Sequence, residues 1–330
     1  MHGKTISRLI ILGLAAVVVV ALPFVAGRLV TELLSTYLIF SLVALSLDLI
    51  WGYAGVLSIG QFVFFGIGAY SAALITTRLT SAGAWSLPMG YAAAVALPAL
   101  LALGLAYVFF TVKLDELFVL VTIAVAIIAE KVAVSQTELL GGLNGIILPN
   151  WVVPLNKAVF FYALVAVIVG VYSLSRFVVN SPFGRVLLGI RDSEKRTQHL
   201  GYDTRAYKAA VYTLAAAIAG LAGGLYANLN GFVSPSLLGF SMSFDAVVWA
   251  ALGGLGTLYG PILGTLLVSW AKFYLSGVLL DYWILVVGLL FIITVIFFPE
   301  GFAGMFRNLR IRLAGRRGSG GSPTPHRKAG

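Results

Sequence analysis

The sequence contains no cysteine, only three histidines and few charged residues. The missing thiol groups exclude disulfide bonds, thiolate metal sites and cysteine nucleophiles. His2, His199 and His326 all lie outside the apolar runs, so none can serve as a base or metal ligand inside a membrane. Charged residues make up 10% of the chain, against about 25% in soluble domains. A soluble enzyme, a secreted disulfide scaffold and a disordered chain are therefore excluded, and we expect this chain to bind no cofactor.

Hydrophobic residues make up 60% of the 330 residues, and the mean hydropathy is +1.00. A water-soluble fold of this size cannot bury so much apolar surface, whereas a membrane protein uses the lipid bilayer as its solvent. Runs of about 20 apolar residues predict an all-α, polytopic membrane protein with about ten transmembrane helices, some of them broken or re-entrant. The clear runs are Leu9–Ala26, Leu33–Leu49, Val56–Thr77, Leu87–Phe110, Leu117–Val134, Ala158–Phe177, Ala209–Asn228 and Tyr282–Phe298.

One further apolar stretch, Phe244–Leu275, is too long for a single crossing, and glycines interrupt it near 253–257. A single crossing would place the two basic regions, 176–208 and the tail after Met305, on opposite sides of the membrane. Two crossings place both regions, and most of the 22 Lys and Arg residues, on the cytoplasmic side, as the positive-inside rule favours. Both termini are then cytoplasmic. The short piece Asp245–Gly254 also fits a re-entrant hairpin.

Residues 1–304 are expected to form the transmembrane domain, and residues 305–330 a basic, disordered cytoplasmic tail rich in Gly, Ser and Pro. Lys4 and Arg8 before the first apolar run also fit a signal peptide, but the run is long for one, and no persuasive cleavage site follows. An uncleaved first span is favoured. Cytoplasmic loops account for the net charge of +10, so we expect no nucleic-acid partner.

Glycine clusters beside neutral polar residues indicate a path for a small polar solute. They lie at 52–60, 141–145 and 253–260. A helix broken by glycine is tolerated in a bilayer only where its backbone is buried or faces a cavity, although close helix packing produces the same pattern. Glu130 lies deepest in its predicted span, whereas Asp245 also fits a helix cap. The candidate pathway-lining residues are Ser58, Gln61, Glu130, Asn144, Asp245 and Thr257.

The other ionisable residues of the predicted spans are Asp48, Lys131 and Lys272. Most of the ionisable residues lie near predicted helix ends, where the charged group can reach the membrane interface. A proton-coupled carrier is expected to have more intramembrane acids or histidines, which counts against secondary transport. An ATP-independent carrier or channel stays as the alternative function.

The most distinctive segment begins at Ser181 and reads SPFGRVLLGIRDSEKRTQHLGYD. Ser181 and Pro182 favour a helix start, and Gly201 favours a helix end. Apolar and charged residues are mixed between them, which predicts a short amphipathic cytoplasmic helix within about 181–206. Such a helix between two spans can transmit force from a soluble partner, and a solvated connector is the other interpretation.

Together with DLIWGYAGVLSIGQ from Asp48, IAGLAGGLYA from Ile218 and the closing FPEG from Phe298, this segment resembles permease subunits of ABC importers for branched-chain amino acids and urea, the LivM and UrtC types. The resemblance implies a transport subunit, not an enzyme, that forms part of the pathway for branched-chain amino acids or for urea and short amides. It also implies a bacterial cytoplasmic (inner) membrane location. The implied partners are ABC ATPase subunits that hold ATP and Mg²⁺, a second homologous permease and an extracytoplasmic substrate-binding protein.

In this family the segment at 181–206 resembles the coupling helix, which docks in a cleft of the ATPase subunit. Many members carry an acidic residue where this chain has Ile127, and Glu130 lies one turn further along the chain. Residues 58–70 look closer to the amino-acid type and residues 254–277 to the urea type, which leaves the substrate open. Carried over by the resemblance, the residues that would contact the ATPase subunit are Gly189, Arg191, Asp192, Glu194, Leu200 and Gly201.

Overall fold

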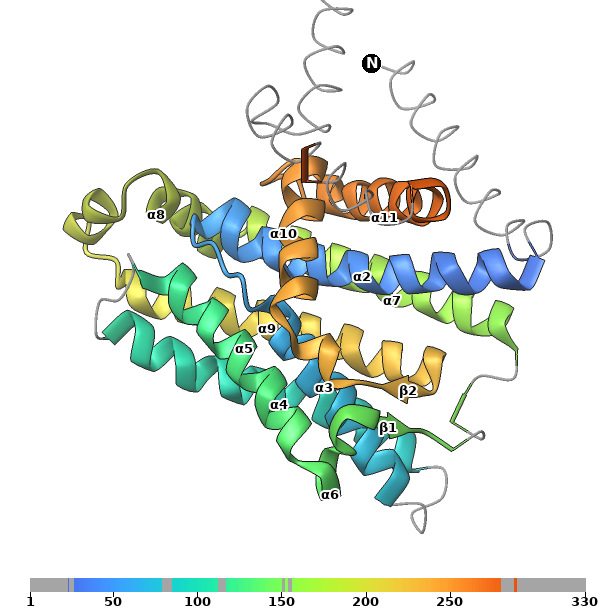
Figure 1. Ribbon diagram of the computed structural model, residues 1–330. Helices are drawn as coiled ribbons and strands as arrows, with labels where there is room; N and C mark the ends of the chain where they lie inside the picture. The colour runs from blue at the N-terminus through green and yellow to red at the C-terminus, as the bar shows by residue number, and fades with distance from the viewer. Residues whose placement is uncertain are drawn as a thin grey trace, which may run out of the picture.

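The computed structural model of the chain describes residues 23, 27–78, 85–111, 117–149, 152–153, 156–279 and 288–289. These residues form a bundle of helices with two very short strands (Figure 1). The expected first and last spans, Leu9–Ala26 and Tyr282–Phe298, fall almost wholly outside the described residues, and the expected tail at 305–330 falls entirely outside them.

The described part of the chain confirms the expected all-α membrane fold. By length and composition, five of its helices (α2, α4, α5, α7 and α9) can cross a membrane. In chain order the elements are α2 (Gly27–Ala54), α3 (Gln61–Arg78), α4 (Ser86–Thr111), α5 (Phe118–Ser135), α6 (Thr137–Leu140), the 3-10 helix η3 (Gly142–Asn144), β1 (Ile146–Ile147), α7 (Lys157–Asn180), α8 (Pro182–His199), α9 (Thr204–Asn230), β2 (Phe232–Val233), the 3-10 helix η4 (Pro235–Leu238), α10 (Phe240–Gly253) and α11 (Tyr259–Leu279).

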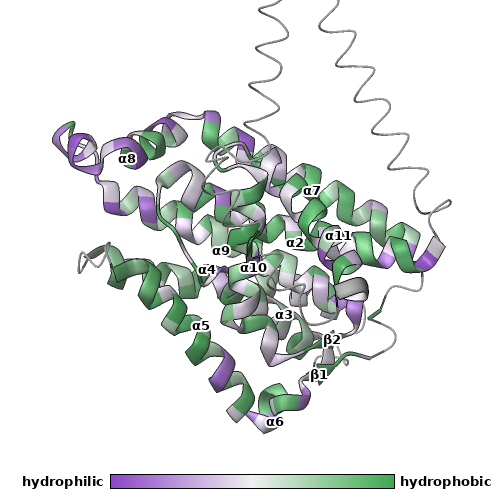
Figure 2. Ribbon diagram, turned by 45° about the horizontal axis from the view of Figure 1, so that its top comes forward, coloured by the Kyte–Doolittle hydropathy of each residue, from purple (hydrophilic) through white to green (hydrophobic). Residues whose placement is uncertain are grey.

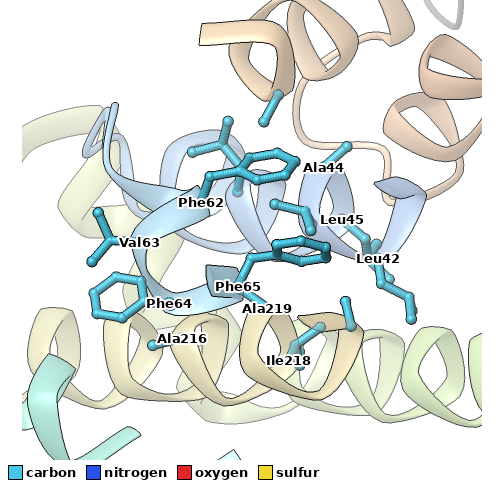
Figure 3. Close-up of a cluster of buried hydrophobic side chains, with 14 of the residues drawn as sticks. Leu42, Ala44, Leu45, Phe62, Val63, Phe64, Phe65, Ala216, Ile218 and Ala219 are labelled. Carbon is cyan, nitrogen blue, oxygen red and sulfur yellow. The ribbon is translucent and has the colours of Figure 1, made fainter. Parts of the chain in front are cut away.

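The centre of the bundle is α9, which packs against α2, α3 and α4. Glycines make this close packing possible, because a Cβ atom on Gly223 would collide with the backbone of α3, and one on Gly68 of α3 would collide with Gly220. Figure 3 shows the aromatic start of α3, from Phe62 to Phe65, buried between α2 and the small residues of α9. The small residues of α9 therefore allow α3 and α4 to approach it closely.

The bundle has two ends. We call the end at α8, where α2 finishes, the α8 end, and the opposite end, where β1 pairs antiparallel with β2, the strand end (Figure 1). Hydrophilic residues gather on α8, whereas hydrophobic residues predominate on α5 and α7 (Figure 2). Apolar side chains are exposed along α4, α5 and α7. An apolar outer surface between a polar end and a short-stranded end is the pattern of a bundle whose sides face lipid.

The long helices α2 and α9 each end at a glycine with left-handed backbone, and non-helical residues follow each. Gly55 (φ 76°) ends α2, and Gly231 (φ 66°) ends α9. The chain is non-helical from 55 to 60, so α3 begins at Gln61 rather than near Val56 as the apolar run predicted. Hydropathy does not separate a buried extended segment from a buried helix.

The predicted break in Phe244–Leu275 is confirmed: α10 ends at Gly253, and α11 begins at Tyr259. With 14 residues, α10 is about 21 Å long, shorter than the roughly 30 Å hydrocarbon core. It is therefore too short to cross the bilayer by itself, and β2, η4 and α10 together return the chain from the strand end to the turn at 254–258, which bonds to Asp48 of α2. The alternative role of Asp245 as a helix cap is wrong, because α10 begins at Phe240 and Asp245 lies inside it.

Candidate functional site

The helix α8 is built from two short pieces. It begins at Pro182 and ends at His199, close to the predicted bounds, and Gly201 follows with φ 90°. Ser193 interrupts it with an extended backbone, φ −165° and ψ 101°. A Cβ atom on Gly189 would lie 3.2 Å from the hydroxyl of Thr197. The absence of a side chain at 189 therefore lets the two pieces fold against each other.

Glu194 holds the second piece of α8 onto α9. Its Oε2 accepts a hydrogen bond from Lys208 Nζ at 2.6 Å, and its Oε1 accepts one from the Thr204 hydroxyl at 2.9 Å. The Lys208 side chain is only 4% exposed, and its ammonium group lies 5.5 Å from the centre of the Phe110 ring. A buried lysine needs such partners, because an unpaired charge in an apolar setting is strongly unfavourable.

Arg191 attaches the first piece of α8 to α2. Its Nη1 donates a hydrogen bond to the Gly52 carbonyl at 2.6 Å. Its aliphatic stem packs on Gly55, where an added Cβ would lie 2.9 Å from Arg191 Cγ. Glycine at 55 therefore serves both the left-handed end of α2 and the close approach of α8.

Three other residues expected to contact an ATPase subunit are exposed at the α8 end. The side chain of Asp192 is 73% exposed, and Leu200 is 73% exposed. Gly201 is exposed, and a Cβ atom added there would meet nothing within 4 Å. The expected contact set thus contains outward residues, of which Asp192 also pairs with Arg191 Nε at 3.7 Å, and two residues whose side chains bond to other helices, Arg191 and Glu194. Contact with another subunit stays a prediction for all six residues.

Asp48 makes a buried contact that the sequence did not predict. It is fully buried inside α2, so the assignment to a helix end is wrong for it. Its Oδ1 accepts a hydrogen bond from the backbone N–H of Gly256 at 2.6 Å, and its Oδ2 accepts one from Leu258 N–H at 2.9 Å. Both donors lie in the turn between α10 and α11. One turn along α2, a Cβ on Gly52 would collide with the Asp48 carboxylate and with Gly256.

A signal for this contact is present in the sequence. Asp48 and Gly52 are four residues apart, so a carboxylate and a bare patch of helix surface share one face of α2. The glycine-rich turn 254–258 has left-handed backbone at Gly254, Gly256 and Leu258, which exposes N–H groups. Only the structure shows that this face of α2 and the turn at 254–258 lie against each other.

Ser58 and Gln61 lie together in the non-helical segment and at the start of α3, and both are buried. Gln61 Nε2 donates to the Ser46 hydroxyl at 2.8 Å, whereas Gln61 Oε1 has no hydrogen-bond partner among the described residues. The backbone around them is held by hydroxyls of other helices. Ile59 N–H donates to Thr122 of α5 at 3.2 Å. Phe62 N–H donates to Ser243 of α10 at 3.3 Å.

The four other candidate pathway residues are dispersed. Glu130 is half-buried on α5, with Oε2 2.7 Å from where a Cβ on Gly239 would lie. Asn144 is exposed in η3 at the strand end. Asp245 accepts a bond from Lys272 Nζ at 2.8 Å, which corrects the expectation that this lysine reaches for the interface.

Thr257 lies in the turn that Asp48 holds. Its hydroxyl donates to the Gly254 carbonyl at 2.8 Å and accepts from Gly260 N–H at 3.0 Å. It therefore stabilises the turn and the start of α11. Lys131 is exposed on α5. Ile127, where family members carry an acid, is 46% exposed on the same helix.

A cavity of about 290 Å³ lies under α8. Its walls combine the end of α2 and the start of the non-helical segment, 54–57, with Phe118 and Val119 of α5. Its polar wall is formed by Arg191, Glu194 and Lys208. The segment that carries Ser58 and Gln61 therefore begins in a polar cavity at the α8 end and runs into the buried interior.

Comparison with known proteins agrees with this architecture. The family model described as "Branched-chain amino acid transport system / permease component" matches residues 29–295. The chain is 29% identical over 351 aligned residues to the high-affinity branched-chain amino acid transport system permease protein LivM of Escherichia coli (strain K12), covering 96% of this chain and 80% of that protein. It is 26% identical over 282 residues to the permease protein BraD of Pseudomonas aeruginosa, covering 80% of this chain and 91% of that protein.

A shorter match, 29% identical over 133 residues, links the chain to LivH of Escherichia coli (strain K12), covering 40% of this chain and 43% of that protein. LivM and LivH are both named as permease proteins of a branched-chain amino acid transport system. No solved structure matches the chain.

Proposed function

The chain belongs to the permease-component family of branched-chain amino acid transport systems, and from that premise we propose that it is one membrane-spanning permease subunit of an ATP-driven importer. Its substrate is a branched-chain amino acid. ATP and Mg²⁺ are held by partner ATPase subunits, and a second, homologous permease completes the pathway. The observation that carries the proposal is α8, a polar two-piece helix bonded to α2 and α9 through Arg191 and Glu194 while Asp192 and Leu200 face outward.

The proposed pathway follows the non-helical segment at 55–60. A branched-chain amino acid is a zwitterion with an apolar side chain, so it needs neutral hydrogen-bonding groups inside an apolar bundle. Ser58, Gln61 and the hydroxyls of Thr122 and Ser243 supply such groups. The cavity under α8 is the proposed exit for the solute.

The proposed orientation places the α8 end in the cytoplasm of a bacterium, with the protein in the inner membrane and both termini cytoplasmic. Support comes from the charge on this end, where α8 and the start of α9 carry Arg185, Lys195, Arg196 and Arg205 in addition to Arg191. Positive residues are retained on the cytoplasmic side. The strand end then faces an extracytoplasmic substrate-binding protein.

The test is purification of the complex from its native membrane, followed by reconstitution into proteoliposomes with the co-purified binding protein. We expect recovery of ATPase subunits and a second permease, and uptake of labelled leucine that requires ATP. Labelled urea in place of leucine separates the two substrate types. Uptake by this chain alone that collapses with the ion gradient would instead establish the secondary carrier.

The role of α8 is tested by the double variant Arg191→Ala and Glu194→Ala. We expect weaker association with the ATPase subunits and lower uptake, with membrane insertion intact. The control removes an Arg and a Glu elsewhere, Arg28 and Glu32, which pair with each other at 3.2 Å near the start of α2. Normal uptake in the α8 variant would exclude the coupling role.

A further inference from the structure

Three segments that are distant in the sequence meet at one point near the α8 end. The α2 helix contributes Asp48 and Gly52, the α10–α11 turn contributes the backbone of Gly256, and α8 contributes Arg191. Arg191 Nη1 bonds the Gly52 carbonyl and lies 3.3 Å from where a Cβ on Gly256 would be. We call this contact the three-way junction.

The junction is stiff for a physical reason. Both carboxylate oxygens of Asp48 are bound by backbone N–H groups, and the side chain is fully buried. A buried carboxylate that lost these donors would have no water to replace them, so separating the turn from α2 is costly. The missing side chain at Gly52 lets the turn reach the carboxylate. The turn therefore has to move together with α2.

The α10 helix carries such a movement to the candidate pathway. Its last residue, Gly253, leads directly into the turn that Asp48 holds. Near its first residue, the Ser243 hydroxyl accepts the N–H of Phe62 at 3.3 Å, next to Gln61. One short helix thus links the junction to the segment that bears the buried polar groups.

We propose that Asp48 is a positioning residue for transport: it joins the α10–α11 turn to α2 beneath Arg191, so that displacement of α8 moves α10 and changes the segment at 55–61. Without this joint, α8 still bonds to α2 through Arg191, but no carboxylate ties α2 to the α10–α11 turn. The inference rests on the proposed function, since it requires a partner that displaces α8. It assigns a role to a carboxylate that touches neither the solute nor the ATPase subunit.

The test is the reconstituted complex with Asp48→Asn, measuring leucine uptake and ATP hydrolysis on the same preparation. The amide retains the size of the side chain but presents an NH₂ group to one of the two backbone donors. We expect uptake per ATP hydrolysed to fall about tenfold, while ATP hydrolysis per assembled complex stays within about twofold. The control is Glu32→Gln, which removes a carboxylate from the other end of α2 and should leave the ratio unchanged.

A merely structural role would reduce the amount of complex and lower uptake and hydrolysis in parallel. An unchanged ratio in Asp48→Asn overturns the inference, provided that the wild-type complex transports. A wild-type complex without ATP-driven uptake overturns the proposed function, and the inference falls with it.

A second variant decides the question if Asp48→Asn does not assemble. Gly256→Ala strains a residue with φ 73° and places a methyl group 3.3 Å from both Arg191 Nη1 and the Gly52 carbonyl oxygen. We again expect uptake per ATP hydrolysed to fall, by less than in Asp48→Asn, while ATP hydrolysis is retained. Its control is Gly277→Ala on α11, where an added Cβ meets nothing within 4 Å. Parallel losses of uptake and hydrolysis in Gly256→Ala would overturn the proposal.

Discussion

The turn at 254–258 and the segment at 55–60 both interrupt helices within the bundle, but different chemistry holds them. The turn gives two N–H groups to the buried carboxylate of Asp48, at 2.6 and 2.9 Å. The segment and the start of α3 are held by the neutral hydroxyls of Thr122 and Ser243, at 3.2 and 3.3 Å. Hydrogen bonds to an ionised acceptor are shorter and roughly twice as strong as neutral ones. The comparison identifies the turn as a fixed joint and the segment as the part that can rearrange.

The largest expected loss of stability comes from removing the Asp48 carboxylate, which joins the turn at 254–258 to α2. Asp48→Ala leaves two buried N–H groups without an acceptor, and we expect the free energy of unfolding to fall by about 3 kcal/mol. Thermal unfolding of the detergent-solubilised protein measures this loss. Asp48→Asn should lie between Ala and the wild type, because one oxygen still accepts. Equal stability of all three proteins would show that the Asp48 carboxylate does not hold the turn at 254–258 more strongly than neutral hydroxyls hold the segment at 55–60.

A slightly smaller effect is expected at Gly52. The methyl group of Gly52→Ala would collide with the Asp48 carboxylate and with the backbone of Gly256, which forces the turn away from α2. Overpacking of this kind costs about 2 kcal/mol. Gly170→Ala on α7, where an added Cβ meets nothing within 4 Å, is the control in the same unfolding assay. A Gly52→Ala protein as stable as that control would show that the turn is not held tightly.

Mutation of the neutral groups that hold the segment at 55–60 should destabilise the protein less. Thr122→Val removes the acceptor of the Ile59 N–H with little change in volume, and we expect a loss of about 1 kcal/mol in unfolding free energy. Thermal unfolding is again the measurement, with leucine uptake recorded alongside. A loss as large as that of Asp48→Ala would remove the distinction between the joint and the segment.

Gln61→Leu should have the smallest effect on stability. Because Gln61 Oε1 is already unpaired among the described residues, its loss removes an unfavourable buried polar atom as well as one bond to Ser46. We expect unfolding free energy within about 0.5 kcal/mol of the wild type. Leucine uptake by the reconstituted complex should nevertheless fall, since a pathway amide is lost. Normal uptake in this variant would remove Gln61 from the pathway.

The sequence predicted those features whose causes are local. Ser181, Pro182 and Gly201 marked the ends of α8, and they are close to the observed bounds. Glycine spacing together with charge balance predicted the break between α10 and α11. The ends of α8 and the glycines of the break depend on residues close together in the chain, where backbone preferences act directly. The charge balance that favoured two crossings compared regions 176–208 and the tail after Met305.

Features that depend on distant partners were missed. Asp48 binds a turn 208 residues away, and Lys272 pairs with Asp245 across 27 residues. The residue pattern of one segment does not indicate which distant segment packs against it. The non-helical backbone at 55–60 was missed for a different reason, because a non-helical apolar segment inside a bundle has the same hydropathy as a helix.

The three-way junction has a consequence for how the protein can change by mutation. Each of its bonds joins one side chain to a main-chain atom: Asp48 to two N–H groups, and Arg191 to a carbonyl. Among the described residues, none of these hydrogen bonds joins two side chains that compensating substitutions could exchange. Inheritance of the junction therefore requires a carboxylate, a guanidinium and two positions that stay bare, at Gly52 and Gly256, and a change at any one of them has no simple suppressor elsewhere.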